Sequence, residues 1–137
     1  MSKSELFRKT VQRTGSPPVL VDPYQGVVFF LDSPTRNSWL EVGPFQVYFR
    51  KSSRIIAGGT RDTLDIANVL RDDPNKGGKG ELWMMIEELK SLLLRRIPGR
   101  CLYFENVLND QLRESLINKG WIPVEGTNPP SYYKELT

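Results

Sequence analysis

The sequence contains no histidine and a single cysteine among its 137 residues. Without histidine, a Ser-His-Asp triad, a Cys-His pair and any His-based zinc or iron site are excluded. A lone cysteine, Cys101, also excludes an internal disulfide and a cysteine-rich metal cluster. Cys101 lies in the strand-like run CLYFEN, which favours a buried structural thiol over a nucleophile. We therefore expect no metal site, and any chemistry must use carboxylates, hydroxyls, backbone amides or a bound cofactor.

Long apolar runs are also lacking. The longest, VVFF and SLLL, are far shorter than the ~20 residues of a membrane-spanning helix. The first residues, MSKSELFRKTVQRTG, are polar and charged, unlike a secretory signal peptide. We expect a cytoplasmic protein with no membrane association.

A strong excess of one charge is absent as well. The 19 Lys and Arg against 16 Asp and Glu leave a net charge of +3, and only the segment LRRIPGR clusters its cations. This mild excess suits a phosphate-bearing ligand but is too small to indicate nucleic acid by itself. A nucleic-acid-binding module, which needs a clustered basic patch, therefore ranks last among the possible functions. The length and the ordinary balance of hydrophobic and charged residues predict a single domain over residues 1–137.

The first half of the chain reads as a short helix followed by strands. Residues 4–13 can form a helix that ends at the GSPP segment. Five strand-like runs follow: VLVD, VVFFLD, SWLEV, FQVYFR and RIIA. EVGPFQ and AGGTRD supply turn residues between them. In FQVYFR the alternation of apolar and polar residues is typical of a half-buried strand.

The second half alternates strands and helices. TLDIANVL (63–70) predicts a strand with Leu64, Ile66, Asn68 and Leu70 on one face, largely buried on both sides. The spacing of apolar residues predicts a helix over 81–96, and CLYFEN predicts the next strand. A second helix is expected over 110–119, with Asn109 as its N-cap and Gly120 at its C-terminus. Its predicted buried stripe is Leu112, Leu116 and Ile117, and WIPVE and SYYKEL predict two closing strands.

The segment NKGGKGEL places three glycines and two lysines directly before the first of these helices. Glycines let the backbone approach an anion, and a helix N-terminus offers unpaired N–H groups and partial positive charge. The segment lacks the Gly-Lys-Ser/Thr ending of a P-loop and the third glycine of a dinucleotide fingerprint. Alone, a Gly-x-Gly before a helix is a weak signal, and a solvated turn is then the favoured interpretation.

The order of these segments over residues 63–137 resembles the GNAT-type N-acetyltransferases. That family has a Gln/Arg-x-x-Gly-x-Gly/Ala loop, matched here by residues 75–80 with Asn75 at the Gln/Arg position. The strand, asparagine, helix and Gly-aromatic pair that follow resemble CLYFEN, Asn109, QLRESLINK and Gly120-Trp121. The resemblance implies an α/β fold with a mixed central sheet of about six to seven strands and helices on both faces. Compact, divergent members of this kind look similar to proteins encoded by bacteriophages.

The resemblance also implies acetyl-CoA as co-substrate. The pantetheine arm would lie between the two central strands, near Val69 and Leu70 and beside Asn109. The pyrophosphate would lie on the glycine loop, and the adenosine phosphate near Lys76, Lys79 and Arg71. The implied cofactor-binding residues are Val69, Leu70, Lys76, Gly77, Gly78, Lys79, Gly80 and Asn109.

Acetyl transfer to an amine needs a base. Asp65 on the central strand and Glu105 at the end of the next are the acidic candidates, although either could be a solvated strand carboxylate. In the family, a tyrosine seven residues after the asparagine often acts as the acid that protonates the leaving thiolate. Here that position is Leu116, which has no proton to give. The adjacent Ser115 points about 100° away on the helix. Trp83 and Trp121 are interpreted as core or edge aromatics and not as ligand platforms. One of Tyr132 and Tyr133 is expected to be buried.

Two functions remain from the sequence. The first is an acetyl-CoA-dependent N-acetyltransferase acting on an unidentified amine, in a protein or a small molecule. The second is a catalytically degenerate GNAT-fold protein that binds or inhibits a protein partner, favoured by Leu116 at the tyrosine position. The closing strand pair commonly mediates dimers in the family, so a homodimer is possible in either case.

Overall fold

The computed structural model describes residues 22–71, 80–97 and 99–136. The N-terminal helix expected over 4–13 lies outside these residues, as does nearly all of the VLVD segment. The described elements in chain order are α2 (Gln25–Asp32), β1 (Asn37–Val42), β2 (Phe45–Ile56), β3 (Gly59–Arg71), α3 (Glu81–Arg96), β4 (Cys101–Phe104), α4 (Asp110–Asn118), β5 (Ile122–Pro123) and β6 (Tyr132–Glu135).

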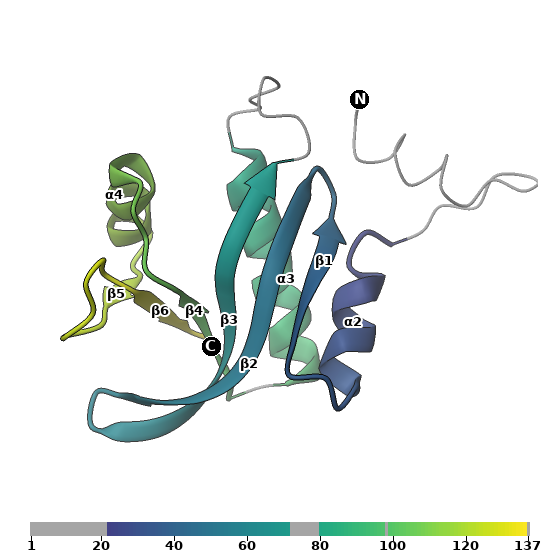
Figure 1. Cartoon of the computed structure of the whole chain (residues 1–137), viewed down its shortest axis with the longest axis horizontal. Helices are drawn as coiled ribbons and strands as arrows, with labels where there is room; N and C mark the ends of the chain where they lie inside the picture. The colour runs from purple at the N-terminus through teal and green to yellow at the C-terminus, as the bar shows by residue number, and fades with distance from the viewer. Residues whose placement is uncertain (1–21, 72–79, 98, 137) are drawn as a thin grey trace, which may run out of the picture.

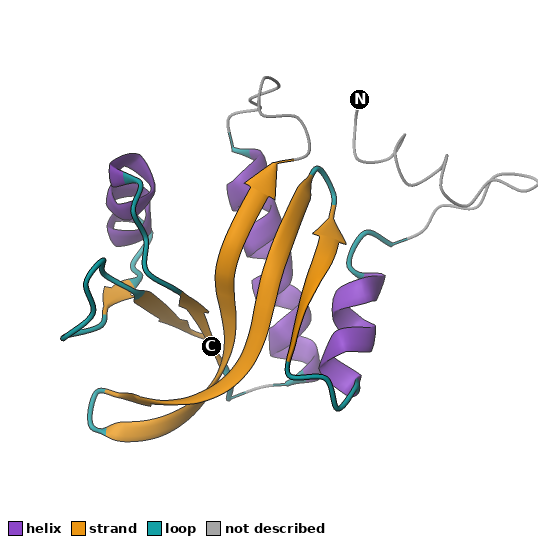
Figure 2. Ribbon diagram, in the orientation of Figure 1, coloured by secondary structure: helices purple, strands orange, loops and turns teal. Residues whose placement is uncertain are grey.

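The described strands form one six-stranded mixed sheet in the order β1-β2-β3-β4-β6-β5. Among these described strands, only β3 and β4 run parallel, from the pair Thr63–Cys101 to the pair Ile66–Phe104. The crossover that joins these two strands contains α3, as a parallel connection requires. Figures 1 and 2 show α2 and α3 behind the long β1–β3 part of the sheet, with α4 standing beside the short strands β5 and β6.

The segment VVFFLD forms a helix, so its prediction as a strand was wrong. Val27 and Phe30 of α2 are buried, three residues apart, whereas Phe29 between them is 65% exposed. The ring of Phe30 packs 6.4 Å from that of Phe49 on the sheet. A short apolar run fits a buried strand and a helix equally well, and packing against the sheet decides the outcome here.

The strands β1 and β2 and the turn between them are confirmed, but RIIA is the end of β2 and not a separate strand. The β2–β3 hairpin turns at Ala57 and Gly58, which have φ angles of 51° and 81°. Lys51 of β2 donates hydrogen bonds to the carbonyls of Phe30 and Ser33, at 2.8 and 2.7 Å. This lysine closes the C-terminus of α2, where free carbonyls favour a cation.

The core lies between the sheet and the helices. The apolar spacing on α3 predicts a buried face of Leu82, Met85, Ile86, Leu89 and Leu93. The last four are fully buried, and Leu82 is half-buried against the core. On α4 only part of the predicted stripe is buried. Leu116 is inaccessible, but Ile117 is 55% exposed and its prediction as a core residue was wrong. Cys101 is fully buried as predicted, and burial raises the pKa of its thiol.

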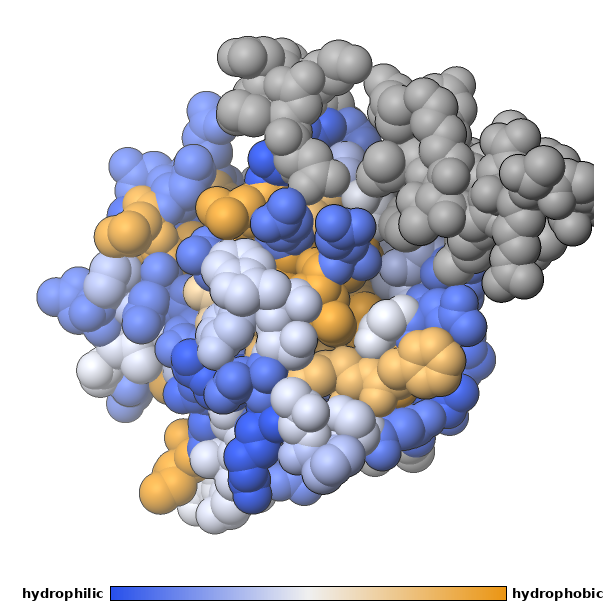
Figure 3. Space-filling model, turned by 45° about the vertical axis from the view of Figure 1, so that its right-hand side comes forward, coloured by the Kyte–Doolittle hydropathy of each residue, from blue (hydrophilic) through white to orange (hydrophobic). Residues whose placement is uncertain are grey.

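On the face in Figure 3, apolar side chains in orange gather in the middle of the face and toward its right-hand side, with smaller separate places at the left and hydrophilic side chains in blue around them. Within residues 22–71, 80–97 and 99–136, no helix is both long enough and apolar enough to cross a membrane.

Candidate functional site

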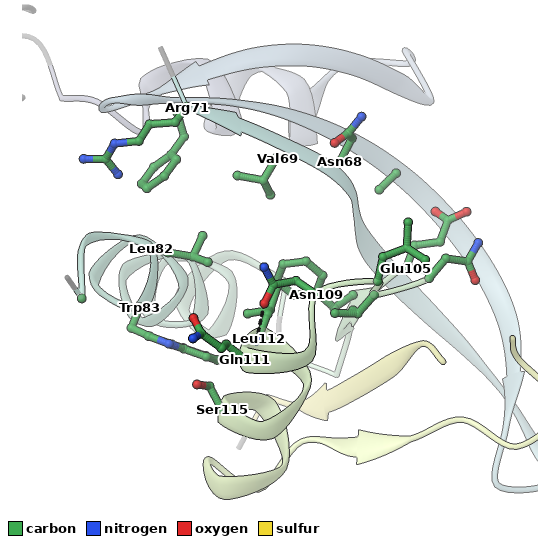
Figure 4. A pocket seen from close by; sticks show the side chains of 17 residues that line it. Asn68, Val69, Arg71, Leu82, Trp83, Glu105, Asn109, Gln111, Leu112 and Ser115 are labelled. Atoms are coloured by element: carbon green, nitrogen blue, oxygen red, sulfur yellow. Dashed lines mark hydrogen bonds between the residues drawn. The ribbon is translucent and has the colours of Figure 1, made fainter. Parts of the chain in front are cut away.

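The parallel strands β3 and β4 separate after a few residues and leave a cleft between them. Their pairing ends at Ile66 and Phe104, followed by one bond from the Glu105 N–H to the Ile66 carbonyl at 3.1 Å. β3 then continues to Arg71, while the chain after β4 turns away toward α4. The resulting cleft has a volume of about 820 Å³ and is bounded by β3, the first turn of α3, the β4–α4 segment and α4 (Figure 4).

A β-bulge shapes the β3 wall of the cleft. Phe49 of β2 pairs with Ile66 and Tyr48 pairs with Asn68, so Ala67 is an extra residue without a partner on β2. The bulge reverses the alternation of the strand. Val69 therefore joins the core side, and Leu70 is 48% exposed. The prediction that Asn68 and Leu70 share a face with Ile66 was wrong for this reason.

The bulge matters for the cleft because Ala67, Asn68 and Val69 all line it. A bulged residue is not paired in the ladder, so its backbone groups are available to a ligand. Of the two β3 residues expected beside a ligand, Val69 lies in the cleft wall (Figure 4). Leu70 is not among the described lining residues and can contribute only through its backbone.

The N-terminus of α3 opens onto the same cleft. Gly80 precedes the helix with a φ of 89°, a left-handed conformation that glycine adopts most readily. Among the described residues, no side chain caps this helix, so none of them occupies the N–H groups of its first turn. Gly80 is the one residue of the glycine loop within the described part of the chain. Lys76, Gly77, Gly78 and Lys79 lie outside it.

Arg71, at the end of β3, lies across the cleft from this helix end. Its guanidinium pairs with Glu81 in the first turn of α3 and sits 5.2 Å from the ring centroid of Phe45. Figure 4 shows Arg71 near Leu82, at the α3 end of the cleft. This is the region where an anionic group of a ligand would meet both a cation and a helix N-terminus.

The start of α4 and the segment before it form the remaining wall of the cleft. Asn109 caps the helix, its side-chain oxygen accepting a hydrogen bond from the Leu112 N–H at 3.0 Å, as the sequence predicts. The preceding residues are tied to the segment before β6. The Asn106 N–H donates to the Ser131 hydroxyl at 2.9 Å and the Val107 N–H to the Pro130 carbonyl at 2.8 Å. Asn109 is thus fixed at the cleft (Figure 4).

The two acidic candidates occupy different environments. Asp65 is fully buried and accepts hydrogen bonds from Ser52 at 2.7 Å, Thr63 at 2.6 Å and Arg54 at 2.7 Å. This carboxylate does not line the cleft within the described residues.

Glu105 does line the cleft, at its open side (Figure 4). It accepts two hydrogen bonds from Arg50, and Arg54 lies 3.7 Å away. Neither carboxylate is the solvated strand residue that the sequence allowed as an alternative, since each has at least one arginine partner. Both belong to one ionic network on β2, β3 and the end of β4.

Two further residues differ from the sequence expectation. Trp83 was expected as a core or edge aromatic, yet it lines the cleft. Ser115 also lines the cleft, whereas its neighbour Leu116 is fully buried. The helical rotation of about 100° per residue places one in the cleft wall and the other in the core. Trp121 is buried in the core as predicted, and of Tyr132 and Tyr133 it is Tyr132 that is buried there.

No protein-family model and no curated protein matches this chain. Two solved structures of a tyrosine-to-phenylalanine mutant of the AtaT toxin are similar to it. In one, the toxin is bound to the C-terminus of the antitoxin AtaR and to acetyl-CoA. Its sequence identity to this chain is 18% and the TM-score is 0.50, and the match covers 66% of this chain and 57% of the toxin chain. In the other, bound to the antitoxin C-terminus, the identity is 16%, the TM-score 0.50 and the coverage 67% and 58%.

This chain therefore spans less than two thirds of the length of the toxin chains that it matches. At these identities the likeness shows the fold. Together with the six-stranded mixed sheet and its helices, it confirms the GNAT-like α/β fold predicted from the sequence.

Proposed function

We propose that the chain is an acetyl-CoA-dependent N-acetyltransferase whose acceptor is an amine of a protein or a small molecule. The observation that carries the proposal is the cleft where β3 and β4 diverge, with the uncapped N-terminus of α3 at one end and Glu105 at the other. The acetyl-CoA bound to the structurally similar AtaT toxin supports the same cofactor here.

In this proposal the elongated coenzyme lies along the cleft. Its pyrophosphate meets the α3 N-terminus at Gly80, with Lys76, Gly77, Gly78 and Lys79 of the preceding loop as further contacts. The pantetheine arm runs past Val69 and Asn109, and its amides pair with the free backbone at the β3 bulge and at Leu70. The thioester then reaches the side of the cleft near Glu105.

The chemical step transfers the acetyl group from sulfur to nitrogen. Glu105 takes a proton from the acceptor ammonium, directly or through water, and the free amine attacks the thioester carbonyl. The carbon–sulfur bond of the tetrahedral intermediate then breaks, giving the amide and the coenzyme A thiolate. Asp65 is a weaker candidate for the base, because it is buried and saturated with hydrogen bonds away from the cleft.

The leaving thiolate has no tyrosine to protonate it. Leu116 occupies the position of that residue in the family and is buried in the core. A thiol with a pKa of ~8.5 is a moderately good leaving group, and water in the open cleft can supply the proton. We therefore expect turnover that does not depend on a side-chain acid.

Calorimetric titration of the full chain with acetyl-CoA, and separately with coenzyme A, tests the proposal. Micromolar binding that weakens when Lys76 and Lys79 are both replaced by Gln supports it. Lys134→Gln controls for a general loss of positive charge. In the wild type the ammonium of Lys134 donates a hydrogen bond to the Lys119 carbonyl. A folded wild-type protein that binds neither ligand would exclude the acetyltransferase.

The second candidate is a catalytically degenerate GNAT-fold protein that binds or inhibits a protein partner. The pairing of Glu105 with Arg50 favours it, since both oxygens of the carboxylate already accept hydrogen bonds from Arg50 Nη1. The antitoxin segment bound to the similar toxin supports a protein partner. Tight coenzyme binding without acetyl transfer to any amine in a broad acceptor screen would favour this alternative.

The single-domain organisation, the cytoplasmic location, the phage-like origin and the homodimer stay predictions. Mass measurement in solution by light scattering tests the homodimer directly. A mass of twice 15.7 kDa supports it, and a mass of 15.7 kDa contradicts it.

A further inference from the structure

The face of the sheet opposite α2 and α3 carries a row of aromatic and charged side chains. Phe49 of β2 packs against α2, so its neighbours Tyr48 and Arg50 lie on the other face of the strand. Trp39 of β1 is the cross-strand partner of Tyr48 and shares that face, with the two rings 5.2 Å apart. Figures 1 and 2 show α2 and α3 behind this part of the sheet, so neither helix covers the row.

Arg50 connects this row to the open side of the cleft. Its guanidinium carbon lies 5.7 Å from the centroid of the Tyr48 ring, and its Nη1 holds the carboxylate of Glu105. Asn68, which lines the cleft, is the β3 partner of Tyr48. The row therefore leads from Trp39, which is 47% exposed, to the carboxylate proposed as the base.

The guanidinium of Arg50 has donors to spare. Nη1 makes both of its hydrogen bonds within the described residues, and neither Nε nor Nη2 has a hydrogen-bond partner there. The side chain is 35% exposed. Nε and Nη2 form one of the forks of a guanidinium, whose geometry matches the two oxygens of a carboxylate. Arg50 can thus hold Glu105 and receive a second carboxylate at the same time.

Glu105 has room for an ammonium group beside this fork. Each of its oxygens accepts one hydrogen bond from Arg50, whereas an ionised carboxylate has about four acceptor positions. A ligand that satisfies both residues needs an amine and a carboxylate only a few bonds apart, as in a free α-amino acid. A lysine side chain or the N-terminus of a protein has no carboxylate so close to its amine.

The two rings next to Arg50 favour one kind of amino acid. Aromatic rings attract one another beyond the burial of their area, in tilted or offset arrangements. Tyr48 is half-buried and the more exposed Trp39 lies beyond it. An aromatic side chain of the ligand would lie against these rings while its carboxylate meets Arg50.

We propose that the acceptor is a free α-amino acid with an aromatic side chain. Its carboxylate pairs with Nε and Nη2 of Arg50, its amine faces Glu105, and its ring lies against Tyr48 and Trp39. The inference rests on the proposed function and names its substrate class. The amine nitrogen bonds to the acetyl carbon, the carbon–sulfur bond breaks, and the amine proton passes to Glu105. The products are an N-acetyl amino acid and the coenzyme A thiolate.

Two acceptors that differ by one group test the fork: phenylalanine, and phenethylamine, which lacks the carboxylate. Release of free thiol from acetyl-CoA gives kcat/KM for each with the full chain. The wild type should prefer phenylalanine by about tenfold to a hundredfold, as expected for hydrogen bonds between charged groups. In Arg50→Gln both rates should fall, because Arg50 also positions Glu105, and the preference should disappear. A role in positioning Glu105 alone would leave the preference unchanged.

Arg61→Gln is the matched control. Arg61 lies on β3, its side chain is 32% exposed and it also pairs with a glutamate, Glu135, but it is absent from the described cleft lining. This variant should keep the wild-type preference. Trp39→Ala tests the aromatic contact independently, since Trp39 lies outside the buried core. It should reduce the preference for phenylalanine over alanine and leave the preference over phenethylamine unchanged.

Calorimetric titration of phenylalanine into the protein with excess coenzyme A adds a readout that does not need turnover. Binding that is lost in Arg50→Gln and retained in Arg61→Gln supports the inference. The same binding without any acetyl transfer supports the amino-acid site and contradicts the proposed function.

Other outcomes overturn the inference. Transfer to phenethylamine as fast as to phenylalanine, or an unchanged preference in Arg50→Gln, overturns it and leaves the proposed function in place. Coenzyme A binding with neither binding nor acetylation of phenylalanine has the same meaning. Equal rates with alanine and phenylalanine overturn the contact with the aromatic rings. A folded protein that binds neither coenzyme A nor phenylalanine overturns both proposals.

Discussion

Arg50 Nη1 donates hydrogen bonds to both carboxylate oxygens of Glu105, at 3.0 and 2.8 Å. The two residues are 55 positions apart in the sequence, on β2 and just after β4. The pair fixes the Glu105 carboxylate at the open side of the cleft, where β3 and β4 have diverged.

Glu105→Gln should lower the rate of acetyl transfer by a factor of about 10²–10⁴, the usual contribution of a general base. The amide keeps the shape of the side chain but cannot take a proton. Coenzyme A affinity should stay within twofold of the wild-type value, since no pyrophosphate contact is lost. The assay is release of free thiol from acetyl-CoA in the presence of an amine identified by screening. A rate equal to that of the wild type would show that Glu105 is not the base.

Asp65→Asn should destabilise the fold by about 3 kcal/mol. Its carboxylate is fully buried and paired with Arg54, and removing one partner of a buried pair leaves the other uncompensated. The free energy of unfolding from urea titration measures the loss. Asp62→Asn is the matched control, because Asp62 bonds to Ser53 on the exposed hairpin and should cost less than about 0.5 kcal/mol. Equal losses in the two variants would contradict a structural role for Asp65.

Asn109→Ala should cost about 1 kcal/mol of stability, because it removes the side-chain acceptor for the Leu112 N–H at the start of α4. Asn109→Asp keeps that acceptor and should restore the stability. If Asn109 also contacts the pantetheine arm, Asn109→Ala should weaken the binding of coenzyme A and of 4′-phosphopantetheine by similar factors. Binding that is unchanged in the alanine variant would limit Asn109 to the helix cap.

Two features of the helices are predicted correctly from neighbouring residues alone. The bounds of α3 follow from its apolar spacing and the residues that flank it, and the Asn109 cap is recognisable from residue type and position. The α2 segment was misread because an apolar run of this length has no period that separates strand from helix. Its identity depends on packing against Phe49, a residue from a different element.

The shape of the site depends on contacts between distant segments. The bulge at Ala67 arises from the pairing of β3 with β2, and strict alternation along β3 could not reveal it. The pairing of Arg50 with Glu105 and the position of Trp83 in the cleft likewise require the assembled sheet and helices. A signal for Trp83 was present, since it lies three residues after the glycine loop, but helical spacing alone made a core role equally reasonable.

Cys101 should not react with a thiol reagent in the folded protein. It is fully buried, and burial raises the pKa of its thiol, which disfavours the reactive thiolate. A colorimetric thiol assay should give no signal near pH 8 in buffer and one thiol per chain in denaturant. Because the folded pKa is raised, the contribution of this thiol to stability is present at neutral pH and falls as the pH rises through the folded pKa. Rapid reaction of the native protein would contradict the burial.

Leu116→Tyr should destabilise the protein without increasing its activity. The resemblance to the N-acetyltransferases places a proton-donating tyrosine at this position, but Leu116 is fully buried in the core. A tyrosine there would force extra volume and a hydroxyl into a packed interior, at a cost of about 1–3 kcal/mol. The midpoint of urea unfolding measures this cost. Leu116→Met, which nearly conserves the volume, is the control and should cost less than about 1.5 kcal/mol.

Ser115, the neighbour of Leu116 on α4, lines the cleft. Ser115→Tyr therefore places a phenol in the cleft, whereas Leu116→Tyr places it in the core. We expect this variant to keep wild-type stability, because its ring extends into the open cleft. If the phenol reaches the leaving thiolate, the transfer rate rises; if it fills the space of the coenzyme, affinity falls. Either change shows that position 115 borders the bound coenzyme. The opposite result is a Leu116→Tyr protein that is as stable as the wild type and transfers acetyl groups faster. That result would show that α4 can turn its buried face toward the cleft.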